Sequence, residues 1–205
     1  MPQHAIRSHL AVVHPSLAAR DDVVLLLPRR PDESTWRPSD VLEFIQEHGD
    51  TTALVFLSGV HYATGQLFDM ASITRTAHER GGMVGFDLAH AVGKIELELH
   101  KWGVDFGIFC TYKYLSAGPG AVGGCFVHAK HTPEGAEGPA RFAGWWGQNE
   151  QDRFSFAEPD FRPAAGALGS SSRRPPLCSL LHSARLWPFF ARPAAWPRSA
   201  QNPCA

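Results

Sequence analysis

The stretch that decides the fold is DFGIFCTYKYLSAGPG, residues 105–120. A short apolar run leads straight into Lys113, which stands between two tyrosines and is followed by a glycine-rich turn. An apolar run of this length, bounded by turn residues, is typical of a buried β-strand. We therefore expect a strand over 104–110 that carries the amine of Lys113 to its carboxyl end. A lysine there either extends its amine to water or takes part in chemistry.

Outward from this strand, short apolar runs alternate with segments of helical periodicity. Ser39 is the expected N-cap of the first helix, and Gly49 lies just past its end. Short apolar strands separated by helices predict an α/β fold, a mostly parallel sheet with helices on both faces. The expected strands cover 23–27, 52–58, 83–87, 104–110 and 121–128, and the expected helices cover 38–50 and 69–82.

Polar groups follow three of these strands. In open α/β sheets, functional groups gather at the carboxyl ends of the strands, where Ser58, Asp87 and Lys113 are expected. A lysine amine and a carboxylate facing one crevice are the minimal equipment for pyridoxal phosphate: the amine condenses with the aldehyde, and the carboxylate keeps the ring nitrogen protonated. A tyrosine beside the lysine, Tyr112, can donate its hydroxyl to the phosphate. Non-catalytic alternatives stay open for each residue. Lys113 could be an ordinary surface lysine, Asp87 could cap a helix, and Ser58 could shape a turn.

Composition excludes several classes of partner. The 205 residues carry a formal net charge of -1 and show no basic stripe, which argues against nucleic acid. Four cysteines without CxxC spacing indicate free thiols in a reducing compartment. The longest aliphatic run, 23–27, is far too short to span a bilayer, so we expect a cytoplasmic protein without a membrane partner. The histidines at 100, 128 and 131 do not supply ligand spacing with Asp87 and His90, so no metal site is expected.

The sequence changes character near residue 166. Residues 166–205 are rich in proline, arginine and serine, and they show no sustained period of 2 or 3.6. We expect one partial domain over 1–165 and a poorly ordered tail over 166–205. A basic docking tail and a stretch translated out of frame are both compatible with this composition, and the second is the better fit.

Three segments, LSGVHYATGQLFDM at 57–70, the run from Val84 to His131, and GWWGQNE at 144–150, resemble kynureninases. These are fold-type-I pyridoxal phosphate enzymes of the aspartate aminotransferase superfamily, and the resemblance covers residues 4–162. It implies roles for six residues: Lys113 as the Schiff-base lysine, Asp87 on the pyridine nitrogen, His90 lining the cofactor pocket, Ser58 and Tyr112 binding the cofactor, and Trp145 reaching it across a homodimer interface.

The resemblance also implies an activity. Such an enzyme hydrolyses L-kynurenine or 3-hydroxykynurenine to anthranilate or 3-hydroxyanthranilate plus L-alanine, in tryptophan catabolism and NAD biosynthesis. Two alternatives stay open: another pyridoxal phosphate enzyme, such as a cysteine desulfurase or a class V aminotransferase, and a catalytically incomplete fragment. The second arises because the family's stacking aromatic residue and its carboxylate-binding arginine find no counterpart in this chain.

Overall fold

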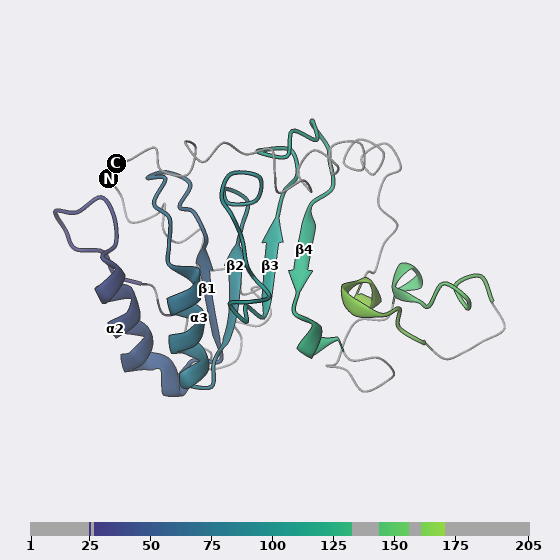
Figure 1. Ribbon diagram of the computed structural model, residues 1–205, viewed down its shortest axis with the longest axis horizontal. Coiled ribbons are helices and arrows are strands. Elements are labelled where there is room, and N and C mark those ends of the chain that lie inside the picture. Colours follow the sequence, from purple (N-terminus) through teal and green to yellow (C-terminus); the bar gives the residue numbers. More distant parts are fainter. Residues whose placement is uncertain (1–24, 26, 133–143, 156–160, 171–205) are drawn as a thin grey trace.

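The computed structural model describes residues 25, 27–132, 144–155 and 161–170 (Figure 1). Its centre is one four-stranded sheet in the order β1-β2-β3-β4. The first three strands are parallel and β4 is antiparallel to β3. The prediction of a mostly parallel α/β sheet is therefore confirmed. The strands are β1 (Leu54–Ser58), β2 (Met83–Asp87), β3 (Phe106–Phe109) and β4 (Gly124–Val127).

Within the described ranges, two α-helices accompany the sheet, α2 (Pro38–His48) and α3 (Met70–Glu79). The N-cap of α2 is Arg37, so the prediction of Ser39 is wrong. Pro38 is the reason, because its fixed φ suits the first helical position and starts the helix before the serine. In α3 the Asp69 side chain is the cap, and it accepts a hydrogen bond from the Ser72 amide at 3.0 Å.

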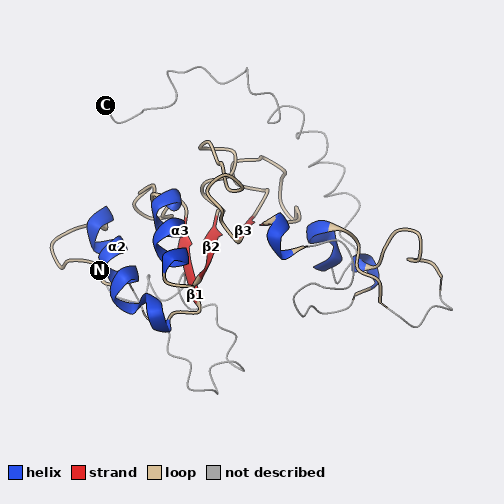
Figure 2. Cartoon of the chain, turned by 60° about the horizontal axis from the view of Figure 1, so that its bottom comes forward, coloured by secondary structure: helices blue, strands red, loops and turns tan. Residues whose placement is uncertain are grey.

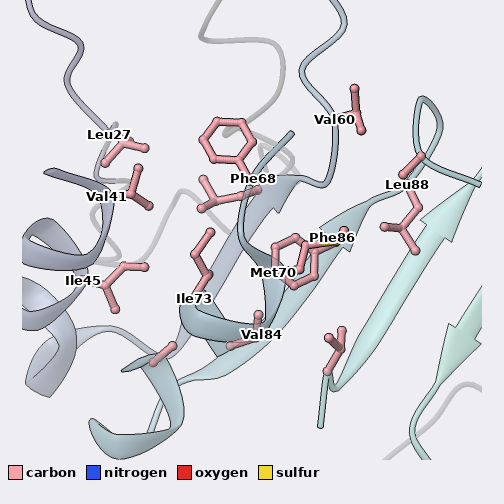
Figure 3. Close-up of a cluster of buried hydrophobic side chains, with 14 of the residues drawn as sticks. Leu27, Val41, Ile45, Val60, Phe68, Met70, Ile73, Val84, Phe86 and Leu88 are labelled. Carbon is pink, nitrogen blue, oxygen red and sulfur yellow. The ribbon is translucent and has the colours of Figure 1, made fainter. Parts of the chain in front are cut away.

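The core lies between the helices and one face of the sheet. Figure 3 shows Ile73 of α3 close to Val84 and Phe86 of β2, and both β2 side chains have no exposed surface. The α2 side chains Val41 and Ile45 belong to the same buried cluster. Helix α3 therefore lies against this face, and α2 packs beside α3, as the cartoon in Figure 2 also shows. Helices on the second face remain a prediction beyond the described residues.

The second face of the sheet carries the alternate residues of each strand. Here the rings of Phe56 and Phe106 stack with centroids 5.9 Å apart, on either side of Gly85. A Cβ atom at position 85 would overlap the Phe106 ring, which explains the glycine. Next to this stack, Leu54, Met83 and Ile108 each keep almost half of their surface exposed. The described part of this face is apolar and open.

The connections between consecutive strands of the sheet have different structures. Helix α3 links β1 to β2, whereas turns rather than a helix lead from β2 to β3. The expected strand 23–27 is not formed at Leu25 or Leu27, and its other residues lie outside the described part. The described residues also contain four short 3₁₀ helices: η1 (Gly49–Thr51), η2 (Ala129–His131), η3 (Trp145–Gly147) and η4 (Gly166–Ser170).

The predicted tail falls mostly outside the described residues, which end at 170 with η4. Of the four cysteines, Cys110 and Cys125 are described, and both are free thiols. Neither of the α-helices in the described ranges has the length and hydrophobicity needed to cross a membrane.

Candidate functional site

The three parallel strands end at one edge of the sheet. Ser58 and Asp87, the last residues of β1 and β2, are direct partners in the register. Two amides extend the hydrogen bonding just past the strand ends: Gly59 donates to the Asp87 carbonyl at 2.8 Å, and Leu88 donates to the Ile108 carbonyl at 2.7 Å. The sequence analysis predicted functional side chains at this carboxyl-terminal edge of the sheet.

Asp87 shapes the chain that follows it. Its Oδ1 accepts a hydrogen bond from the Ala89 amide at 2.9 Å, which closes a tight turn directly after β2. The side chain is half-buried, and the turn continues into the 88–95 segment that carries His90. Asp87 therefore closes a turn, and the described residues form no helix after it that it could cap. This hydrogen bond uses one carboxylate oxygen, and the second oxygen of Asp87 can still accept a hydrogen bond from a cofactor.

The amine of Lys113 meets the imidazole of His90, with 3.0 Å between Nζ and Nε2. Both side chains are partly buried. The family resemblance implied that both residues lie at the cofactor, but their 23-residue separation did not indicate a direct contact. The chain between β3 and β4 brings them together.

That chain is held in a fixed loop. The Thr111 hydroxyl donates to the Val122 carbonyl at 2.5 Å, and the Ala117 amide donates to the Thr111 carbonyl at 3.0 Å. Ser116 adopts a φ of 53°, which is uncommon for a residue other than glycine. A tight turn of this kind fixes the direction in which Lys113 leaves the backbone.

The two tyrosines beside Lys113 take different positions. Tyr112 is 53% exposed, and its ring centroid lies 5.8 Å from Lys113 Nζ. Tyr114 places its hydroxyl 3.4 Å from His90 Nδ1. The alternation Tyr-Lys-Tyr was the available sequence signal, but it does not reveal which tyrosine faces the histidine.

Trp145 lies on η3, beyond β4 in the chain. Its indole nitrogen donates to the Arg153 carbonyl at 2.6 Å, and its ring packs edge-on against Trp146 and Phe154. The indole is 54% exposed. These contacts all lie within residues 144–155. The expected approach of Trp145 to the cofactor of a partner subunit stays a prediction.

The side chains at this edge fit pyridoxal phosphate by their chemistry. A lysine amine suits the aldehyde, a carboxylate suits the protonated ring nitrogen, and an imidazole and hydroxyls can donate to the oxygens of the cofactor. Lys113 and His90 are in contact, and Asp87 and Ser58 end adjacent strands of the same edge. These four residues are the ones that would hold the cofactor at this edge.

Comparison with known proteins defines the class. The family model described as aminotransferase class-V matches residues 15–161. The chain therefore belongs to the class-V aminotransferase family, whose enzymes use pyridoxal phosphate. A structural match agrees: the apo cysteine desulfurase of Thermococcus onnurineus NA1 superposes with a TM-score of 0.59 at 17% identity, covering 79% of this chain and 37% of that one. At that identity the match shows the fold alone.

Within this class the chain is similar to kynureninases. It is 48% identical to the kynureninase of Koribacter versatilis over 77% of this chain and 36% of that protein. It is 49% identical to the kynureninase of Flavobacterium psychrophilum over 78% of this chain and 37% of that protein. The chain thus spans little more than a third of the length of these relatives.

Proposed function

We propose that this chain carries the cofactor-binding centre of a kynureninase-type enzyme, with Lys113 as the residue that holds pyridoxal phosphate. The observation that carries the proposal is the contact between Lys113 and His90 at the strand edge that also holds Asp87. Similarity to kynureninases at 48% identity supports the reaction type. Another pyridoxal phosphate reaction, as in the cysteine desulfurases, is supported only at the level of the fold.

Each residue has a chemical role in this proposal. Pyridoxal phosphate, when bound, supplies an electron sink for carbanion chemistry. Lys113 would hold its aldehyde, and the lysine amine is the natural base for the substrate's Cα proton. Asp87 would hold the ring nitrogen, where a carboxylate favours the protonated ring. Ser58 and Tyr112 would hold the phosphate through their hydroxyl groups.

The reaction is a hydrolysis of a carbon–carbon bond. The bond between Cβ and Cγ of kynurenine breaks, hydroxide derived from water adds to Cγ to give the anthranilate carboxyl group, and a proton goes to Cβ to give alanine. We assign L-kynurenine and 3-hydroxykynurenine as the substrate class, in tryptophan catabolism and NAD biosynthesis. A cytoplasmic homodimer with Trp145 at the subunit interface belongs to the same proposal, as does the division into a domain over 1–165 and a tail.

Lys113→Ala tests the anchor directly. Purified chain mixed with pyridoxal phosphate is expected to show the visible absorption band of a lysine-linked cofactor, and Lys113→Ala is expected to abolish it because alanine has no amine. The measurement is an absorption spectrum after removal of free cofactor. Formation of anthranilate from L-kynurenine by the same sample then tests the reaction type.

Lys101→Ala is the matched control. Lys101 lies on the exposed side of the turns before β3, where its amine pairs with Glu98 at 3.0 Å. Its loss should leave the band unchanged. A parent chain without the band, or equal losses in the two variants, would show that Lys113 is not the anchor.

A further inference from the structure

The hydroxyl of Tyr114 lies on the opposite side of the His90 imidazole from Lys113. Lys113 Nζ is 3.0 Å from Nε2, and Tyr114 Oη is 3.4 Å from Nδ1. The rings of Tyr114 and His90 also meet edge-on, with centroids 5.7 Å apart. The three side chains form a row in which the histidine lies between an amine and a phenol.

The positions of the hydrogen atoms in this row follow from which groups can donate a hydrogen bond. A protonated lysine has only donors, so the imidazole nitrogen that faces it must be the acceptor. The other nitrogen, Nδ1, then carries the ring hydrogen and donates it to the Tyr114 oxygen. In a neutral histidine, the partner of one nitrogen decides the state of the other.

We propose that Tyr114 is a positioning residue that holds His90 as the Nδ1–H tautomer, with Nε2 open toward Lys113. The inference rests on the proposed function, in which the Lys113 amine must gain and lose protons. A proton that leaves Lys113 Nζ can then move to His90 Nε2. The Nδ1–H bond to the Tyr114 oxygen is kept throughout, so the imidazolium never lacks an acceptor.

The backbone around Tyr114 supports a fixed position. The Tyr114 carbonyl packs so closely on Gly93 that a Cβ atom there would lie 2.9 Å from its oxygen, and Gly93 has a φ of +79°. The ammonium of Lys94 lies 5.2 Å from the centroid of the Tyr114 ring. The 88–95 turns that carry His90 are therefore packed directly against the Tyr114 segment.

The groups that make these contacts with His90 can be replaced one at a time. Lys113 faces Nε2, Tyr114 faces Nδ1, and Lys94 adds a positive charge behind the tyrosine ring. Asp87 starts the turn on which His90 lies. Replacing Tyr114 by phenylalanine keeps the ring contact with His90 and the contact with Lys94, and it removes only the hydroxyl.

The test measures the tautomer of His90 in the full chain without cofactor. Long-range proton–nitrogen correlation spectra of protein labelled with ¹⁵N-histidine report which ring nitrogen carries the hydrogen, and His90→Gln assigns the signal. The parent is expected to show the Nδ1–H form at neutral pH. In Tyr114→Phe the ratio of Nδ1–H to Nε2–H should fall about five-fold, as the loss of one modest hydrogen bond predicts. Lys113→Met should lower the ratio as well, because it removes the donor facing Nε2.

Tyr62→Phe is the control, since Tyr62 is a comparably exposed tyrosine whose ring contacts His61. It should leave the His90 ratio unchanged. A parent in the Nε2–H form, or a ratio that is the same in the parent and Tyr114→Phe, would overturn the proposal. Because no cofactor is present, this result is independent of the absorption band: a missing band with the expected tautomer refutes the proposed function and leaves the position of His90 intact.

Discussion

At the scale of single residues, a buried carboxylate away from the candidate site gathers four hydrogen-bond and ion-pair partners. Asp105, immediately before β3, has a side chain only 3% exposed. One carboxylate oxygen accepts from His131 Nε2 and Lys130 Nζ, each at 2.6 Å. The other accepts from His78 Nε2 at 2.8 Å and from the Val84 amide at 2.6 Å. This one side chain joins α3, β2 and η2 to the start of β3.

We expect Asp105→Asn to lower the free energy of unfolding by about 3 kcal/mol, because it breaks a buried ionic cluster and leaves donors without an acceptor. Denaturant unfolding measures the change. Asp50→Asn is the control: Asp50 pairs with Arg80 at 3.2 Å, but its side chain is 76% exposed, so a loss below about 1 kcal/mol is expected. Equal losses in the two variants would contradict the role of Asp105.

The same cluster predicts a dependence on pH. Burial alone would raise the pKa of Asp105, but hydrogen bonds from Lys130, His78 and His131 outweigh it and hold the pKa well below the ordinary value. A carboxyl group whose pKa is lowered by folding stabilises the fold above its unfolded pKa of about 3.9, and this contribution is lost as the pH falls further. Unfolding curves recorded below pH 4 should therefore show a shallower decline for Asp105→Asn than for the parent.

At the scale of elements, the sequence was most informative where one local rule decides the outcome. β2 formed over the predicted 83–87, because an apolar run between Gly82 and a polar residue leaves little choice of boundary. The start of α2 was misplaced because proline outweighs serine at a helix entrance. The contact of Lys113 with His90 was not predictable, since it depends on the turns after β2 and on the loop shaped by Thr111.

Helix α3 offers a test of one such local rule. Asp69 caps its first turn through the Ser72 amide, and this hydrogen bond is the main cause that lowers the pKa of Asp69. Asp69→Ala should cost about 1 kcal/mol of the free energy of unfolding, whereas Asp69→Asn should cost much less because asparagine also caps. Thermal and denaturant unfolding of both variants measure the difference. If the alanine and asparagine variants lost the same stability, the cap would not be the cause.

At the scale of the whole molecule, the sheet is unevenly covered. Helix α3, with α2 packed beside it, covers one face, whereas the described part of the other face exposes Leu54, Met83 and Ile108 by 47%, 45% and 46%. Most of the length of the matched kynureninases lies outside the segment that this chain matches. An open apolar face of this kind is a surface that tends to associate, so the isolated chain is expected to self-associate through it.

Leu54 and Met83 are direct partners in the register of β1 and β2, which allows a substitution that preserves both pairing and net charge. The double variant Leu54→Lys with Met83→Glu places opposite charges on neighbouring strands, where they attract rather than repel each other. We expect it to reduce self-association at least about ten-fold, with little loss of stability because both side chains are already half exposed. Sedimentation velocity over a range of concentrations measures the degree of self-association.

Leu67→Lys is the control, because Leu67 is 56% exposed but lies outside the sheet, in an isolated bridge with Val60. If Leu67→Lys dissolved the assemblies and the double variant did not, the open sheet face would not be the associating surface.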